Sequence, residues 1–260
     1  MIFKDQLNNT IEFQSFPKRI ISLVPSQSEL LWDLGLRSEL VGITKFCIHP
    51  NEMFKAVVKI GGTKTLNIEK IRSLKPDLII GNKEENEQSQ IIELQKEFPV
   101  WMSDIYNLED SLSMIQNVGE IVNRVEEANE IKTTIETSFF NLNKTNNSVL
   151  YLIWYNPYMA AGKATFIGNI LYKMGLNNVL VDSNARYPEL SMDSIKQLNP
   201  ELIYLSSEPF PFNEKYVLEF QTKFPNSKII VVDGEMFSWY GSRLLKSVNY
   251  LNQLLITSGK

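Results

Sequence analysis

Short runs of apolar, often branched residues alternate with longer segments of helical periodicity along the whole chain. This alternation is typical of strand-helix-strand units, in which helices cover a parallel sheet. Eight runs have the length of a strand, which is enough for two small sheets. They are residues 20–24, 40–43, 78–80, 100–102, 149–154, 178–181, 202–205 and 229–232. The sequence therefore predicts an α/β fold with two lobes, each a small, mostly parallel sheet flanked by helices.

The chain also contains an internal repeat. Residues 67–80 read again as residues 191–204, and each copy predicts a capped helix, a proline stop and a strand. A helix followed by a proline and a strand is common in α/β proteins. Three matched segments in the same order nevertheless argue that the similarity of the two halves is not due to chance. The other two pairs are 35–42 with 175–182, and 98–99 with 224–225. The two lobes are thus expected to share one topology.

A long helical stripe lies between the two copies. Apolar residues recur at helical spacing from Leu108 to Phe139, Asn107 suits the N-cap, and Gly119 is the only glycine or proline inside the stripe. A helix over 107–142 would be a rod of roughly 50 Å. We therefore expect an N-terminal lobe over 1–106, a bridging helix over 107–142 and a C-terminal lobe over 143–260.

The composition limits the classes of function. A hydrophobic fraction of 43% with 22% charged residues is ordinary for a globular chain. The longest apolar stretch, 149–155, is far shorter than the roughly 18 to 20 residues that a membrane span needs. A net charge of -4 leaves no basic surplus for a phosphate backbone. We expect neither a transmembrane segment nor a nucleic-acid partner.

One cysteine, Cys47, and one histidine, His49, limit the metal chemistry. A structural zinc site needs about four Cys or His ligands, and a disulfide needs two thiols. A transition metal is therefore expected to arrive inside an organic chelate, and Cys47 to be a small buried hydrophobe. The chain begins without a basic segment followed by an apolar core, so as written it reads as cytoplasmic.

Several motifs occur in a characteristic order: residues 17–26 with Glu29, 41–43, 61–63, 74–79, 156–157 with Gly162, and 198–201. Their order resembles that of the helical-backbone substrate-binding proteins of ABC importers, which capture vitamin B12 and ferric siderophores, and most of all the cobalamin-binding group. The resemblance implies two α/β lobes joined by one rigid helix, a ligand cleft between them, small opening motions, a monomer, and an importer permease as partner. It also implies a periplasmic or extracytoplasmic setting, so the compartment stays open.

Segments that directly follow the strands are expected to line the ligand site, because ligands lie beyond the carboxyl ends of parallel strands. Ser26 begins a predicted capping box with Glu29, which would aim a helix N-terminus at the ligand; alternatively Ser26 only caps its helix. By resemblance, Phe46 stands where B12-binding relatives carry a cleft aromatic. His49 is a candidate axial ligand to a chelated metal, and otherwise a loop histidine beside Pro50.

Aromatic and polar residues after the other strands complete the predicted site. Aromatic faces pack flat chelates and polar groups bind their edges, although each ring also suits a core position. Trp154, inside a strand, is expected in the core. The B12-binding relatives carry tryptophans at the places matched here by Thr63 and Asn82, so two of their stacking surfaces are absent. The predicted ligand-binding residues are Ser26, Phe46, His49, Thr63, Glu84, Glu85, Asn156, Tyr158, Tyr187, Trp239 and Tyr240.

The resemblance further implies a docking carboxylate in each lobe, because family members present acidic residues to arginines of the permease. Glu69 occupies the first-lobe position. Its repeat mate is Asp193, and Glu235 is a second candidate in that lobe. Each of them is also a favourable carboxylate for the first turn of a helix.

The resulting prediction is a substrate-binding protein of an ABC importer that captures a metal chelate, first of all a corrinoid, without a catalytic cofactor. Three alternatives stay open: a ferric siderophore or haem binding protein, a cytosolic protein that handles corrinoids or similar chelates, and an enzyme on the same fold. The sequence lacks G-x-S-x-G, G-x-G-x-x-G and P-loop motifs, and one histidine would have to serve any triad. No enzyme is therefore expected.

Overall fold

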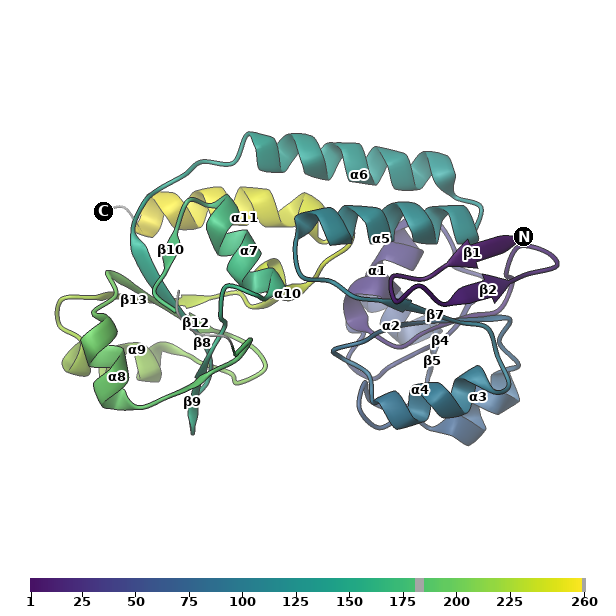
Figure 1. Cartoon of the computed structure of the whole chain (residues 1–260), viewed down its shortest axis with the longest axis horizontal. Coiled ribbons are helices and arrows are strands. Elements are labelled where there is room, and N and C mark those ends of the chain that lie inside the picture. The colour runs from purple at the N-terminus through teal and green to yellow at the C-terminus, as the bar shows by residue number, and fades with distance from the viewer. Residues whose placement is uncertain (181–184, 259–260) are drawn as a thin grey trace. The chain divides into compact units, whose positions relative to one another are not determined.

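The computed structural model describes residues 1–180 and 185–258 and divides into two compact units, each with its own sheet (Figure 1). The first unit consists of Met1–Ile105, Glu109–Glu136 and Trp239–Leu245. The second unit consists of Tyr106–Leu108 together with the described residues in two further segments, Thr137–Ser238 and the segment that begins at Lys246. The segment Trp239–Leu245 therefore belongs to the first unit, although it follows the last strand of the second unit in the sequence.

A five-stranded sheet forms the centre of the first unit. Its strands lie in the order β5, β4, β3, β6, β7, and all neighbouring pairs are parallel. Every residue of β3, β6 and β7 is buried, as expected for parallel strands that are covered on both faces. The strands are β3 (Ile20–Ser22), β4 (Leu40–Ile43), β5 (Val58–Lys59), β6 (Leu78–Asn82) and β7 (Val100–Ser103). The helices between them are α1 (Pro25–Asp33), α2 (Asn51–Ala56), α3 (Ile68–Leu74) and α4 (Gln88–Gln95).

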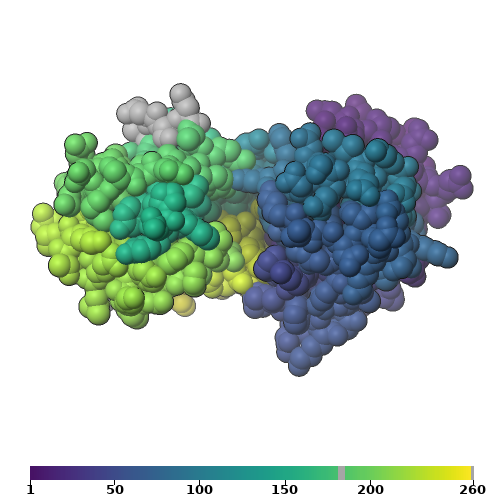
Figure 2. All heavy atoms as spheres, turned by 90° about the horizontal axis from the view of Figure 1, so that it is seen from below, coloured from purple at the N-terminus to yellow at the C-terminus, as the bar shows by residue number. Residues whose placement is uncertain are grey.

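A short antiparallel hairpin, β1 (Ile2–Lys4) and β2 (Thr10–Glu12), precedes this sheet. Asp5 shapes its turn, because its Oδ1 accepts the N–H groups of residues 7 and 9 at 2.9 and 2.7 Å. The N–H of Gln6 donates to the carbonyl of Met102 in β7 at 3.0 Å. The hairpin, purple in Figure 2, lies on the surface of the first unit and is attached there to the edge strand of the sheet.

The second unit repeats this arrangement with additions. Strands β10, β8, β12 and β13 are parallel neighbours, while β9 and β11 continue the sheet in antiparallel pairs. The strands are β8 (Ser148–Trp154), β9 (Tyr158–Ala160), β10 (Asn177–Asn178), β11 (Glu189–Leu190), β12 (Leu202–Ser206) and β13 (Lys228–Val232). The helices are α7 (Phe166–Lys173), α8 (Met192–Leu198), α9 (Glu214–Lys223), α10 (Glu235–Ser238) and, from Lys246 onward, α11 (Leu244–Ser258).

Each unit has its own apolar core. In the first unit, Ile21, Ile79 and Met102 of the sheet pack with residues of α3 and α4. In the second unit, Leu150 and Ile203 of the sheet pack with a cluster that includes the phenylalanines of α9 and its flanks. Two separate cores explain why the chain forms two compact units rather than one.

The mixed α/β class and seven of the eight predicted strands are confirmed, whereas of the described residues in the run predicted over 178–181 only Asn178 lies in a strand. The predicted runs correspond to β3, β4, β6 and β7 in the first unit and to β8, β10, β12 and β13 in the second. Residues 181 and 182, which complete one predicted strand and one repeat phrase, lie outside the described residues. The strands that the pattern does not predict, β1, β2, β5, β9 and β11, have only two or three residues each.

The repeat is confirmed down to the helix ends. Asn67 Oδ1 accepts the N–H of residue 70 at the start of α3, and Ser191 Oγ accepts the N–H of Ser194 at the start of α8, at 2.9 and 3.1 Å. Both helices have seven residues and end at a left-handed residue, Lys75 (φ 47°) and Asn199 (φ 42°). A proline and a strand follow in each copy.

The single helix predicted over 107–142 is wrong, because the range forms two helices, α5 (Leu108–Ile121) and α6 (Val125–Phe140). Asn123 takes a left-handed conformation (φ 56°), which ends α5. Lys132 Nζ of α6 donates to Gln116 Oε1 of α5 at 2.8 Å. A Cβ at Gly119 would lie 2.3 Å from the Cβ of Ala128, so the two helices fold back on each other at this glycine. The apolar stripe runs through both helices because both bury one face.

Candidate functional site

The strand orders locate one candidate ligand surface in each unit. In the first sheet the chain leaves β3 toward β4 on one side and β6 toward β7 on the other. In the second sheet the chain passes from β8 through β9 to β10 on one side of β8, and from β12 to β13 on the other side. Loops that diverge in this way open a crevice at the carboxyl ends of the strands. We call these surfaces the first edge (the segments after β3, β4, β5 and β6, with residues 239–243) and the second edge (the segments after β8 and β12).

The capping box predicted at Ser26 is wrong. Helix α1 begins at Pro25, its N-cap is Val24, and no side chain caps it. Proline suits the first helical position because its fixed φ is helical and its missing N–H is not needed there. Ser26 is therefore inside the first turn and buried. Glu29, the other predicted partner of the box, binds Arg243 instead.

Three loops of the first edge lie against one another. Phe46, which is 50% exposed, lies beside Gly62, where an added Cβ would be 3.2 Å from its ring. Asn86 Nδ2 donates to the carbonyl of Thr63 at 3.1 Å. Lys64 Nζ donates to the carbonyl of Glu84 at 2.6 Å. The structure thus brings the predicted residues 46, 63 and 84 onto one surface.

The turn after β6 is built by two buried asparagines. Asn82 Oδ1 accepts the N–H groups of Glu84 and Glu85 at 2.9 and 3.1 Å, and Asn86 Oδ1 accepts the N–H of Asn82 at 2.8 Å. Asn82 is 2% exposed, so it holds the turn and offers no stacking face. Glu85 Oε1 accepts the hydroxyl of Tyr240 at 2.7 Å. Burial and then the charge of Glu85 raise the pKa of Tyr240 well above its usual value, which keeps this phenol protonated as a donor.

Residues 239–243 bring further predicted residues to the first edge. The rings of His49 and Trp239 meet edge to face at 5.6 Å. Trp239 and Tyr240 are buried, whereas His49 is half-buried. The two aromatic rings therefore support the surface, and His49 and Phe46 are its more accessible side chains.

Cys47 is a buried thiol, as predicted. Ser28 Oγ donates to its Sγ at 3.1 Å, and Thr44 Oγ1 lies at the same distance. Burial raises the pKa of the thiol, so it is not a thiolate at neutral pH. Cys47 belongs to the framework under the loop and not to its chemistry.

The second edge carries an exposed tryptophan that was expected in the core. Trp154, the last residue of β8, is 39% exposed. Its Nε1 donates to the carbonyl of Asn156 at 3.2 Å, and its ring meets Phe210 edge to face at 5.7 Å. The expectation was wrong because the strand leaves the covered part of the sheet at this residue. Phe210, in the segment after β12 (Leu202–Ser206), is a residue of the second edge that the sequence analysis did not single out.

A packed aromatic cluster supports this surface. Tyr155 stacks on Phe210 with ring centroids 5.6 Å apart and an interplanar angle of 21°. The half-buried Tyr158 meets Tyr155 and Phe220 edge to face. Tyr155 donates its hydroxyl to Glu219 at 2.8 Å, and this hydrogen bond raises the pKa of Tyr155 to about 12. Trp154 and Phe210 are therefore backed by side chains that cannot easily move.

Tyr187 and Asn156 also lie in the second unit. The Arg186 guanidinium lies 4.5 Å above the ring of Tyr106 and 5.8 Å from the half-buried ring of Tyr187. Arg186 Nε donates to the carbonyl of Ala164 at 3.0 Å. Asn156 is exposed beside Trp154. Tyr106, another residue that the sequence analysis did not single out, is 38% exposed.

The proposed docking carboxylates occupy matched places in the repeat. Glu69 and Asp193 are both the second residue of their helices, α3 and α8, and both are exposed. Glu69 is bound by Arg72, which also contacts Glu93 and Glu97 of the α4 region. Glu235 starts α10 and is half-buried.

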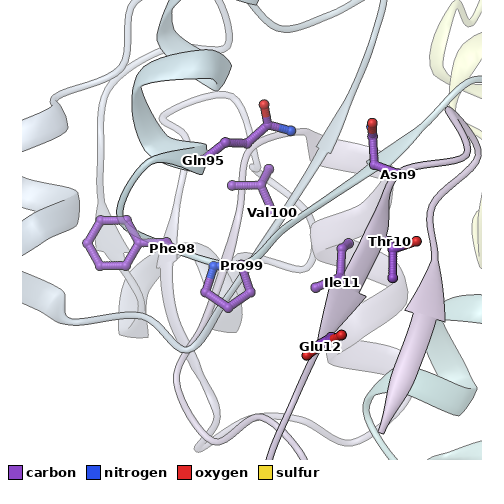
Figure 3. Close-up of a pocket in the computed structure, with 8 residues that line it drawn as sticks. All are labelled: Asn9, Thr10, Ile11, Glu12, Gln95, Phe98, Pro99 and Val100. Carbon is purple, nitrogen blue, oxygen red and sulfur yellow. The ribbon is translucent and has the colours of Figure 1, made fainter.

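A surface hollow of about 380 Å³ lies at the opposite end of the first sheet (Figure 3). It is lined by β2, the last residue of α4 and the residues that lead into β7, and so lies at the amino end of that strand. None of the predicted ligand-binding residues lines it. Ligands of parallel sheets bind at the carboxyl ends, so this hollow does not compete with the two edges.

Across residues 1–180 and 185–258, no group of three or more His, Cys, Asp or Glu side chains is arranged to hold a metal ion. Within the same described ranges, no helix is both long enough and apolar enough to span a membrane.

Comparison with known proteins gives one consistent family. The family model described as periplasmic binding protein matches residues 20–226. The vitamin B12-binding protein of Pectobacterium carotovorum subsp. carotovorum (strain PC1) is 24% identical over 239 residues, which cover 89% of this chain and 86% of that protein.

Two solved structures share the fold. The periplasmic haem-binding protein of Roseiflexus sp. RS-1 has a TM-score of 0.80 at 18% identity, over 94% of this chain and 99% of that one. A siderophore-binding protein, solved with ferric iron and two molecules of acinetobactin, has a TM-score of 0.77 at 19% identity, over 98% and 99%. Since the family model covers most of the sequence, the chain belongs to the periplasmic binding protein family.

Proposed function

We propose that this chain is the substrate-binding component of an ABC importer and that its ligand is a corrinoid. The family and its relatives support the coarser statement, a substrate-binding protein of the vitamin B12, haem or siderophore type. The observation that carries the proposal is the pair of edges at the two switch points. One edge offers the exposed Trp154 backed by Phe210, and the other offers the exposed Phe46 among polar loops.

The polar groups of the first edge favour a corrinoid over haem. Glu84 and Glu85 are carboxylates, which accept hydrogen bonds from the amide groups at the rim of a corrinoid. The same carboxylates would repel the propionates of haem. Thr63 and Asn156 add neutral polar groups. In the first unit we propose that Phe46 packs on a ring of the ligand while Thr63, Glu84 and Glu85 bind polar groups at its edge. In the second unit we propose Trp154 as the residue that contacts a ring and Asn156 as a polar contact.

His49 is the proposed axial ligand of the chelated metal. It is the only histidine of the sequence, and its imidazole is half-buried at the first edge. A neutral imidazole is a good ligand for cobalt and iron. Because the chelate brings its own metal, one imidazole is enough.

Calorimetric titration with cyanocobalamin, cobinamide, aquocobalamin, hemin and a ferric siderophore tests the proposal. We expect one site with a Kd below about 1 µM for a corrinoid, which is roughly 8 kcal/mol. The spectral shift of aquocobalamin on binding should disappear in His49→Ala. If only hemin or only the siderophore binds, that compound and not a corrinoid is the ligand. If no probe binds, the proposal is rejected.

We further propose that Glu69 and Asp193 contact basic residues of an importer permease, and that the protein works outside the cytoplasm, as the family description suggests. Their matched positions in the two repeats support this pairing. In reconstituted uptake, Glu69→Lys and Asp193→Lys should lower transport while the ligand Kd stays unchanged. Unchanged transport would favour the alternative, a chelate-handling protein without a permease.

A further inference from the structure

Four side chains from three separate segments of the sequence lie in a row in the first unit. Arg243 Nε donates to Glu29 Oε2 at 2.8 Å, and Arg243 Nη2 donates to Glu29 Oε1 at 3.1 Å. The guanidinium of Arg243 also lies 4.5 Å from the ring centroid of Trp239. Trp239 in turn meets His49 edge to face, at 5.6 Å and 63°. The row therefore runs from a carboxylate in α1 to the imidazole at the first edge.

The ion pair at the start of this row is fully enclosed. The side chain of Arg243 is 6% exposed and that of Glu29 is 1% exposed. A buried pair is poor evidence for added stability, because the cost of desolvation offsets the attraction, and apolar residues often do as well. Its two parallel hydrogen bonds do, however, fix the plane of the guanidinium. The pair is thus better suited to set an orientation than to stabilise the fold.

The fixed guanidinium plane in turn orients the Trp239 ring on which it stacks. Arginine stacks on an aromatic face through a flat, delocalised cation, which lysine cannot reproduce. Trp239 is buried, so its indole has little freedom once one face is held. The contact between the two rings then restricts the position of the His49 imidazole, which otherwise belongs to the loop that follows β4.

We propose that Arg243, held by Glu29, is a positioning residue that fixes the His49 imidazole at the first edge through Trp239. The positioning stands on the contacts of the first unit alone. Its consequence for ligand binding rests on the proposed function, because it assumes that His49 meets the ligand.

A test without ligand uses the single histidine. His49 gives one set of imidazole proton signals, and the neighbouring indole shifts them by its ring current. Trp239→Phe gives the signal position with the indole removed. Arg243→Lys keeps the charge but loses the paired hydrogen bonds to Glu29 and the stacking on Trp239. We expect this variant to move the His49 signals away from the wild-type position and to broaden or double them. Signals of Arg243→Lys at the wild-type position would overturn the proposal.

Glu29→Asp is the second variant, in case the lysine variant does not fold. It keeps the charge but draws the carboxylate back by one methylene, so it should also move the His49 signals. Circular dichroism establishes that each variant is folded. If a folded Glu29→Asp leaves the His49 signals unchanged, the proposal is wrong.

The ligand test uses aquocobalamin and hemin as probes. Outer residues that orient a metal ligand typically contribute 10-fold to 100-fold to affinity, so Arg243→Lys should raise the Kd roughly tenfold. In a His49→Ala background the same substitution should have no further effect. Additive losses would show that Arg243 does not act through His49. If neither probe binds the wild-type protein, the proposed function fails for these ligands, while the signals of His49 still decide the positioning.

Discussion

Trp154 combines exposure with rigid support, which is unusual for a tryptophan in a strand. It is 39% exposed, its indole N–H is bound to a backbone carbonyl, and Phe210 backs its ring. A large ring held in this way contacts a flat ligand at little cost in side-chain entropy. We expect Trp154→Ala to lose about 1 to 2 kcal/mol of binding, so the corrinoid Kd should rise roughly tenfold in calorimetry.

Tyr172→Ala is the matched control, because Tyr172 is an aromatic residue of the same unit that is 74% exposed on α7. Its Kd should equal that of the wild type. Both variants should keep their thermal midpoints, since neither removes a core side chain. Equal affinities for Trp154→Ala and the wild type would remove the second edge from the ligand site.

In each repeat a carboxylate directly before a strand, Asp77 before β6 and Glu201 before β12, binds the start of the neighbouring strand region. Glu201 accepts the N–H and the hydroxyl of Ser148 at 2.6 and 3.1 Å, and its repeat mate Asp77 accepts the N–H groups of residues 18 and 19 at 2.8 Å each. The hydrogen bonds from Ser148 lower the pKa of Glu201. Glu201 therefore contributes stability above its unfolded pKa of about 4.5, and this contribution is lost as the pH falls through the lower folded pKa.

Glu201→Gln tests this sign. We expect the denaturation midpoints of wild type and Glu201→Gln to differ at about pH 6 and to approach each other as the pH falls below 4.5 and through the lowered folded pKa. Glu130→Gln, at an exposed position of α6, is the control for loss of a surface charge. A difference that stays constant over this range would mean that the ionised form of Glu201 has no special role.

At the scale of elements, the contact between α5 and α6 depends on one glycine. A Cβ at Gly119 would lie 2.3 Å from the Cβ of Ala128 and 2.9 Å from the carbonyl oxygen of Arg124. Gly119→Val must therefore push the helices apart. Overpacking of this kind costs about 1 to 3 kcal/mol, which urea denaturation can measure. Ser113→Val places the same branched side chain on an exposed position of α5 and should cost much less.

The elements that were predictable from sequence are those with a strong local signal. The apolar runs of β3 and β6 and the caps at Asn67 and Ser191 are local features, and all appear as expected. The break at Asn123 was not visible, because the apolar period continues on both sides of it. The two-residue strands β10 and β11 are too short for a pattern of their own, so the bounds of β10 were misjudged and β11 was not predicted.

The candidate site was predictable only in part, for the same physical reason. The rule that ligands lie after parallel strands finds the loops of residues 46, 63 and 84, and the structure joins these loops. Whether a ring faces solvent depends on where the strand leaves the sheet, so Trp154 was misplaced and Phe210 was missed. The pairing of Glu29 with Arg243 spans 214 residues, and no local pattern specifies such a contact.

At the scale of the whole molecule, the duplicated topology gives each unit the same kind of edge at the carboxyl ends of its parallel strands. The order β4, β3, β6, β7 in the first sheet corresponds to β10, β8, β12, β13 in the second. The side chains on the two edges nevertheless differ, with carboxylates and a histidine on one and a tryptophan-phenylalanine pair on the other. A duplicated scaffold can therefore carry different chemistry in each copy, because the loops after the strands vary while the sheet is kept.

Ligand binding should therefore stabilise the whole protein and not a single loop. A ligand that binds only the folded state at 100 times its Kd adds about 2.7 kcal/mol, which for a chain of this size corresponds to roughly 5 to 10 °C in Tm. We expect cyanocobalamin to raise the Tm by this amount in scanning calorimetry, saturably, and to raise it less at the same concentration in Trp154→Ala. Because the proposal gives both edges a part in binding, a corrinoid that binds tightly but leaves the midpoint unchanged would contradict it.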